Sequence, residues 1–224
     1  MSPGPGPLAE LVVWGTLAGL DLVSVLQGML ARPLVAGTVS GWLLGDLGTG
    51  LRIGAALELF ALDVLPIGAA RYPDLAAATV GAVTAAAGAG WSRVLGASVG
   101  LGLVLGLVGG VSLPLVRRLN ARALRAHAAG LTSGDPAAVR AVHLRGLAHD
   151  LGRSLVLALL AVAAGVALRG WTLLDQVTGE WLTATAVAGG LYAAAHGAVA
   201  TVRQRGRLPW LLAGLSVGLL LLTL

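Results

Sequence analysis

Three carboxylates interrupt an apolar stretch in the first third of this chain. Asp46, Glu58 and Asp63 stand among leucines, glycines and alanines in the segment LLGDLGTGLRIGAALELFALDVLP. An ionised carboxylate is costly in an apolar environment unless a partner or a ligand compensates for its lost hydration. We therefore expect these side chains to face either cationic partners or a polar cavity.

Glu58 is the strongest candidate for contact with a ligand. It lies in GAALELFAL, with apolar residues on both sides for more than a helical turn. A carboxylate can accept hydrogen bonds from several ligand hydroxyl groups at once. The alternative is an ion pair with Arg32, Arg52 or Arg71, and the residues alone leave both possibilities open.

The other acidic residues have simpler structural interpretations. Asp46 lies beside glycines in LGDLGTG, where aspartate commonly caps a helix start, although a place beside a binding cavity is the alternative. Asp74 follows Pro73 and precedes an alanine-rich run, which also predicts an N-cap. Asp63 is either a buried polar partner or a residue at a helix end. For Asp21 and His196 we expect packed polar side chains, and for His196 a place on a substrate path or a role in proton transfer is the alternative.

The composition identifies the environment in which these residues must work. Hydrophobic residues make up 57% of the 224 residues and charged residues only 11%, whereas soluble domains carry about 25% charged residues. The sequence therefore predicts an all-α polytopic membrane protein. Every basic residue is an arginine and there is no cysteine, so cysteine metal sites and disulfides are excluded. No polar basic domain is present to bind nucleic acid, and no cofactor is implied.

Apolar runs predict transmembrane helices at 8–30, 94–116, 154–174 and 182–202, with a final run at 208–224. The runs at 34–47 and 51–65 are too short to cross and are bounded by glycine or proline, which predicts broken or re-entrant helices. An alanine-rich helix is expected at 75–89. Gly37, Gly41 and Gly45 recur at a spacing of four residues, which permits close helix packing.

The charges predict the orientation in the membrane. Residues 117–153 carry seven arginines and 203–207 carry three, whereas 175–180 carries none and two acids. Arginine-rich loops mark the cytoplasmic side. We expect two short amphipathic helices at 117–153, around a Gly-Asp-Pro turn. The resulting organisation is a lead-in at 1–7, a membrane core at 8–116, a cytoplasmic segment at 117–153 and C-terminal transmembrane helices at 154–224.

The segment RPLVAGTVSGWLLGDLGTGLRIGAALELFALDVLPIGAARYPD resembles the membrane subunit IIC of the mannose/fructose/sorbose family of bacterial sugar phosphotransferase systems. The residues that carry the resemblance form the pattern of Arg32, Pro33, Gly41, Gly45, Asp46, Thr49, Gly50, Gly54, Leu57, Glu58, Gly68, Ala69, Pro73 and Asp74. A looser similarity covers AHAAGLTSGDPAAVRAVHLRGLAHDLGRSL, with His143 at the family's histidine position. The resemblance extends over residues 8 to about 202.

The resemblance implies a sugar-translocating subunit in the plasma membrane that is not itself an enzyme. Such a subunit forms the path for a hexose or related sugar with a second membrane subunit, IID, while soluble IIA and IIB proteins supply phosphate. The glycine spacing, independently of the resemblance, also permits packing against a second copy of the chain as a homo-oligomer. Glu58 is implied to contact the sugar, and Asp46 and Thr49 to shape that site. Asp63, Pro66, Gly68 and Asp74 are candidates for lining it.

Two residues depart from the mannose-type pattern. Asp63 and Pro66 stand where the mannose-type members have glycine and asparagine. These departures leave the identity of the sugar open. Two other functions are therefore considered: a scaffold or regulatory remnant that transports nothing, and a carrier of a small solute such as a vitamin that works without phosphorylation.

Overall fold

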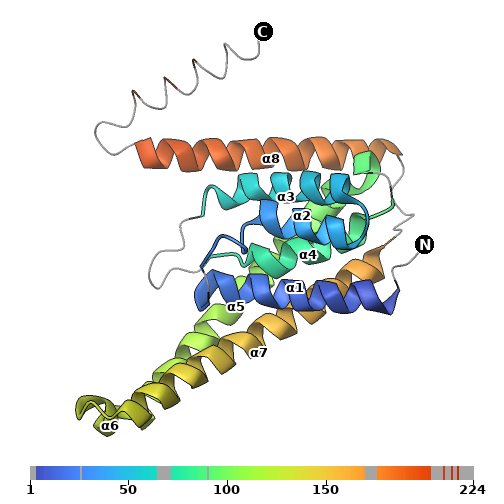
Figure 1. The fold of residues 1–224 in the computed structure, drawn as a ribbon. Helices are drawn as coiled ribbons and strands as arrows, with labels where there is room; N and C mark the ends of the chain where they lie inside the picture. The colour runs from blue at the N-terminus through green and yellow to red at the C-terminus, as the bar shows by residue number, and fades with distance from the viewer. Residues whose placement is uncertain are drawn as a thin grey trace.

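The computed structural model describes residues 4–25, 27–64, 72–89, 91–169 and 176–202, together with positions 209, 213 and 216. The regular structure in these residues is entirely helical. Figure 1 shows helices α1 to α4 and α8 stacked in one body, from which α5 and α7 extend as a long hairpin that ends at α6.

Helix α4 (Leu75–Ala86) is the central element, because every one of its residues is buried. A helix that is apolar on all sides is typical of such a buried position or of a membrane span. Its small residues bring neighbouring helices close: a Cβ atom added to Gly81 would lie 2.5 Å from the carbonyl oxygen of Ala161 in α7 (Pro136–Leu168). The alanine-rich helix predicted at 75–89 is thus present but ends at Ala86, and its place at the centre of the helical body is a finding of the structure.

Helices α2 (Pro33–Leu43) and α3 (Leu47–Ala61) form the tight hairpin that carries most of the candidate residues. Proline occupies the first turn of α2, where its missing N–H costs no helical hydrogen bond. At 11 and 15 residues, both helices are too short to cross a bilayer. The two short, broken helices predicted from the glycine and proline pattern are therefore confirmed.

Glycines bring the backbones of this hairpin into contact. A Cβ atom on Gly37 would lie 2.6 Å from the carbonyl oxygen of Gly50, and one on Gly41 would lie 2.8 Å from the Cα atom of Gly50. Gly45 instead forms the turn, with φ of +70°. Two members of the predicted glycine stripe therefore pack against α3, and the third reverses the chain.

The arginine-rich segment does not form two short helices around its turn, so this part of the prediction is wrong: apart from the five-residue helix α6 (Ala128–Thr132), its helical residues belong to two long helices. Residues 117–126 continue α5 (Trp91–Ala126), and residues 136–153 begin α7. Pro114 lies inside α5 just before the arginine-rich part, and Gly152 lies inside α7 just before the apolar part, but neither residue ends its helix. The Gly-Asp-Pro turn is confirmed: Gly134 has φ of +73°, and Asp135 caps α7 by accepting from two backbone N–H groups.

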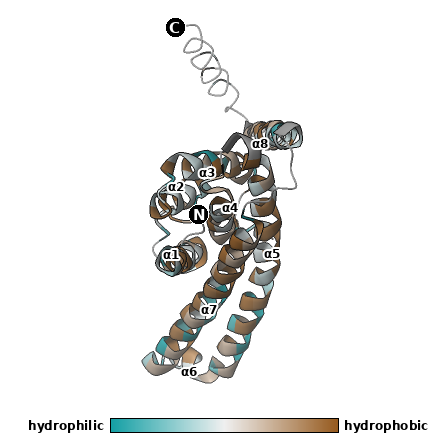
Figure 2. Cartoon of the chain, turned by 90° about the vertical axis from the view of Figure 1, so that its right-hand side faces the viewer, coloured by the Kyte–Doolittle hydropathy of each residue, from teal (hydrophilic) through white to brown (hydrophobic). Residues whose placement is uncertain are grey.

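Three of the described helices are long and apolar enough to cross a membrane: α1 (Pro5–Val23), the Val94–Ala126 part of α5, and α7. Helix α8 (Gln176–Val202) forms where a transmembrane helix is predicted at 182–202. The first predicted run is shorter as a helix, since α1 ends at Val23. The final apolar run predicted at 208–224 lies outside the described residues, apart from positions 209, 213 and 216. In Figure 2, hydrophilic residues recur along the lower parts of α5 and α7, toward α6 (Ala128–Thr132).

Candidate substrate-contact site

Glu58 forms an ion pair with Arg32, across the open end of the α2–α3 hairpin. The Nε atom of Arg32 donates to Oε1 of Glu58 at 2.6 Å, and the Nη2 atom donates to the same oxygen. The side chain of Glu58 is 18% exposed and that of Arg32 is 36% exposed. Of the three arginines that the sequence offered as partners, the structure selects Arg32; Arg71 lies outside the described residues.

The second oxygen of Glu58 binds the start of α2. Its Oε2 atom accepts a hydrogen bond from the backbone N–H of Leu34 at 3.1 Å. The first N–H groups of a helix have no partner within the helix, and the positive end of its dipole favours an anion there. Glu58 therefore connects the second half of α3 to the N-terminus of α2 while remaining partly accessible.

Asp46 caps α3, as the sequence predicts. Its Oδ1 atom accepts from the backbone N–H of Thr49 at 3.2 Å, and its Oδ2 atom accepts from the N–H of Gly88 at 3.0 Å. The cap therefore also connects the α2–α3 turn to the chain that follows α4. Thr49 is buried in the first turn of α3. Both residues fix the shape of the hairpin at the end opposite Glu58.

Asp63 follows α3 and contacts α8. Its Oδ1 atom lies 2.7 Å from Nδ1 of His196, whose ring stacks on Tyr192. His196 and Asp63 are both exposed, at 60% and 37% of their side chains, so the expectation of a packed histidine is wrong. Asp63 proves to be a residue just beyond a helix end. Pro66 and Gly68 lie outside the described residues.

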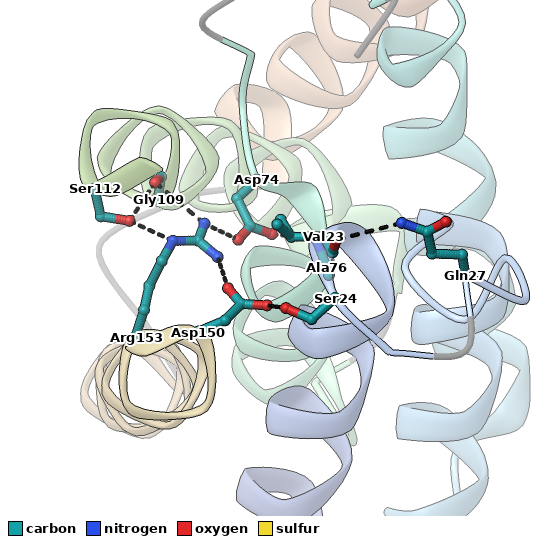
Figure 3. A network of polar contacts seen from close by, with 9 residues as sticks. All are labelled: Val23, Ser24, Gln27, Asp74, Ala76, Gly109, Ser112, Asp150 and Arg153. Carbon is teal, nitrogen blue, oxygen red and sulfur yellow. Dashed lines mark hydrogen bonds and ion pairs between the residues drawn. The ribbon is translucent and has the colours of Figure 1, made fainter. Parts of the chain in front are cut away.

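Asp74 caps α4 and also takes part in a buried charge network (Figure 3). The Nη2 atom of Arg153, in α7, donates to Oδ2 of Asp74, and the Nε atom donates to the hydroxyl of Ser112 in α5 at 2.8 Å. The side chains of Arg153 and Asp74 are only 4% and 1% exposed. This network joins α4, α5 and α7 at one point.

A second carboxylate extends the network to α1. The Oδ1 atom of Asp150 lies 3.6 Å from Nη1 of Arg153, and its Oδ2 atom accepts from the hydroxyl of Ser24, which ends α1. Arg153 is the last residue of the arginine-rich segment predicted at 117–153, but its side chain is buried against α4 and α5. The only hint in the sequence was the i, i+3 spacing of Asp150 and Arg153 beside an apolar run.

Asp21 makes the polar packing contact that the sequence predicts. It is buried in α1 and accepts from the backbone N–H groups of Gly28 at 2.6 Å and Ala31 at 3.0 Å. These bonds hold the irregular chain after α1, where Gln27 and Met29 have positive φ. Because this chain leads directly to Arg32, Asp21 helps to position the arginine that meets Glu58.

Two pockets in the described part of the structure lie away from Glu58. One of about 320 Å³ is lined by α5 residues with Ala85 and Leu168. Another of about 210 Å³ lies between α4, α5 and α7, with Asp74 at its edge. Glu58 instead lies at the surface of the chain, where its side chain is partly exposed. Within the described residues, no cluster of three histidine, aspartate or glutamate side chains is placed to hold a metal ion.

The long apolar helices, the central all-buried helix and the broken hairpin define an all-helical, polytopic membrane protein. The family model described as "PTS system sorbose-specific iic component" matches residues 8–203. The chain therefore belongs to the sorbose-specific IIC family of the phosphotransferase system, as its resemblance implied.

Characterised relatives share parts of the sequence. The mannose-specific EIIC component of Escherichia coli is 34% identical over 117 residues, which are 52% of this chain and 43% of that protein. The sorbose-specific EIIC component of Klebsiella pneumoniae is 42% identical over 74 residues, 33% of this chain and 27% of the relative. The fructose permease IIC component of Bacillus subtilis is 45% identical over 71 residues, 31% and 26% of the two chains. The matches thus span less than half of each relative's length.

Two solved structures have a similar fold. One, described as a membrane protein, has a TM-score of 0.77 at 23% identity and covers 96% of this chain and 87% of its own. The other, a cryo-EM structure of the mannose transporter ManYZ with microcin E492, has a TM-score of 0.64 at 24% identity and covers 97% and 88%. At these identities the likeness is one of fold.

Proposed function

We propose that this chain is the sugar-translocating IIC subunit of a mannose-family phosphotransferase system. The observation that carries the proposal is Glu58: a partly exposed carboxylate at the open end of a broken helical hairpin, within a chain of the IIC family. Broken helices at membrane depth are typical of substrate sites in transporters. Glu58 contacts the sugar, while Asp46 and Thr49 hold the hairpin in shape.

The site is completed by a second membrane subunit. Glu58 lies on a surface of this chain, and a sugar path requires walls on all sides to exclude lipid. A IID subunit packed against the hairpin supplies the missing wall. Soluble IIA and IIB proteins transfer phosphate to the incoming sugar, so that this chain itself performs no phosphoryl transfer.

The arginine-rich hairpin marks the cytoplasmic face. Six arginines lie at 117–145, in the distal parts of α5 and α7. This excess of positive charge favours the cytoplasmic side of a bacterial plasma membrane. In this orientation the α5–α7 hairpin projects toward the side from which the phosphate carriers act.

The experiment that tests this function is sugar uptake in cells that lack their own mannose-family system. The chain is expressed with IIA, IIB and IID, and phosphoenolpyruvate-dependent uptake of D-mannose, D-fructose and L-sorbose is measured. Uptake of at least one sugar, lost when IID is omitted, is expected. Absence of uptake in the complete system would instead favour a scaffold that moves no sugar, whereas uptake without IIA and IIB would favour a phosphorylation-independent carrier.

A further inference from the structure

The Glu58–Arg32 pair retains hydrogen-bonding capacity that its own contacts do not use. A carboxylate offers about four acceptor positions and a guanidinium five N–H groups. Arg32 uses two N–H groups on Oε1 of Glu58, and Leu34 takes one position on Oε2. By this count about one acceptor position remains on Oε2, and about three N–H groups remain on Arg32, among them those of Nη1.

Both side chains are held in place before any ligand arrives. Arg32 is the N-cap residue of α2 and is followed by Pro33, whose ring fixes the backbone at the helix start. Glu58 lies in α3, whose backbone is in direct contact with α2 through Gly37, Gly41 and Gly50. The backbones that carry the remaining acceptor and donors therefore keep a fixed relative position, which lowers the entropic cost of binding.

The charge of the pair indicates the kind of ligand. Arg32 neutralises Glu58, so that the site offers a donor and an acceptor without net charge. Two adjacent hydroxyls of a neutral sugar match this arrangement, because one hydroxyl can donate to Oε2 while its neighbour accepts from the guanidinium. A phosphorylated sugar gains no such match, since its charge meets an already neutralised arginine.

We propose that Arg32 is a second sugar-contact residue, and that Arg32 and Glu58 together bind two adjacent hydroxyls of the transported sugar. This inference rests on the proposed transport function and deepens it. Arginine is suited to the role because its planar fork can serve Glu58 with two N–H groups while the others remain available. A lysine ammonium at this position would keep the positive charge but lose that fork.

The alternative is that the pair only braces the hairpin. In that case Arg32→Lys would reduce the amount of folded complex without changing which sugars it prefers. The test is therefore a measurement of preference rather than of total activity. It uses the complete system with IID, each of the three probe sugars, and the monodeoxy analogues of whichever sugar is taken up, added as competitors of uptake.

For the wild-type complex, we expect two of the monodeoxy analogues to compete about 10- to 100-fold less well than the unmodified sugar. Each of these two analogues lacks one hydroxyl of the adjacent pair, so it leaves a charged group of the site without its hydrogen bond. In Arg32→Lys, the penalty at one of these two positions should largely disappear, while the other persists. Arg140→Lys, an exposed change on α7, should leave all penalties unchanged.

Three outcomes contradict the inference. The first is wild-type uptake in which no pair of adjacent hydroxyls is discriminated, a result that does not depend on whether any variant folds. The second is an Arg32→Lys complex that takes up sugar with wild-type discrimination at every hydroxyl. The third is a lack of uptake of all three sugars by the wild-type system, which removes the proposed function itself and this inference with it.

Discussion

At the scale of single residues, the acidic side chains of this chain divide by what their oxygens meet. Asp46 and Asp74 accept from backbone N–H groups at helix starts, and Asp21 accepts from an irregular loop. Glu58 meets an arginine and a helix start but stays partly exposed. Asp74 and Asp150 share one buried arginine, Arg153. Only Glu58 combines a charged partner with access for a ligand inside the broken hairpin.

Replacement of Arg153 by methionine should destabilise the protein strongly. The change leaves Asp74 buried without its cation, and removing one member of a buried ion pair typically costs about 3–5 kcal/mol. The free energy of unfolding in mixed micelles, followed by tryptophan fluorescence, measures the loss. The exposed change Arg140→Met should cost less than about 0.5 kcal/mol. Adding Asp74→Asn to Arg153→Met should recover part of the stability; no recovery would contradict the proposed importance of the unpaired charge.

At the scale of elements, the hairpin was predictable and the charge network was not. Pro33, Gly45 and the cap residue Asp46 lie next to the elements they start or end, so their effect is visible in the local sequence. Arg153 meets Asp74 across 79 positions of the chain, and its neighbourhood in sequence is rich in exposed arginines. Likewise, the sequence could not choose among three arginines for Glu58, because that choice depends on how α2 lies against α3.

The contact between α2 and α3 gives a direct test of the hairpin. In Gly50→Ala the new Cβ atom would meet the backbone of Gly41, with Cα only 2.6 Å away. Backbone cannot move aside as a flexible side chain can, so the helices must separate. We expect sugar uptake to fall at least tenfold, because Arg32 and Glu58 lose their register, and stability to fall by about 1–3 kcal/mol.

A glycine elsewhere provides the matched control. An added Cβ atom on Gly152 in α7 has no neighbour within 4 Å. Gly152→Ala should keep uptake and raise stability by about 0.5–1 kcal/mol, since alanine has the higher helix propensity. Equal effects of the two substitutions on uptake would show that close packing of α2 on α3 is not required.

At the scale of the whole molecule, two parts serve different purposes. The body around the buried helix α4 carries the hairpin and Glu58, and the α5–α7 hairpin extends away from it, with hydrophilic residues recurring toward its far end (Figures 1 and 2). In the proposed orientation, the body contains the sugar path within the bilayer. The α5–α7 hairpin then reaches the cytoplasmic side.

Cysteine labelling tests this orientation cleanly, because the chain contains no cysteine. Ser133→Cys lies at the tip of the α5–α7 hairpin, and Thr178→Cys lies in the first turn of α8. A membrane-impermeant maleimide should label Thr178→Cys in intact cells, and Ser133→Cys only after the membrane is permeabilised. The reverse pattern would place the arginine-rich hairpin outside the cell and contradict the proposed topology.

The most direct test of the central claim is equilibrium binding of the transported sugar to the purified complex with IID. Glu58→Gln is compared with Glu10→Gln, which makes the same chemical change at an exposed position of α1. We expect Glu58→Gln to raise the dissociation constant at least tenfold, because a neutral amide accepts a weaker hydrogen bond than a carboxylate. Glu10→Gln should leave the constant unchanged. Wild-type affinity in a folded Glu58→Gln complex would remove Glu58 from the sugar site.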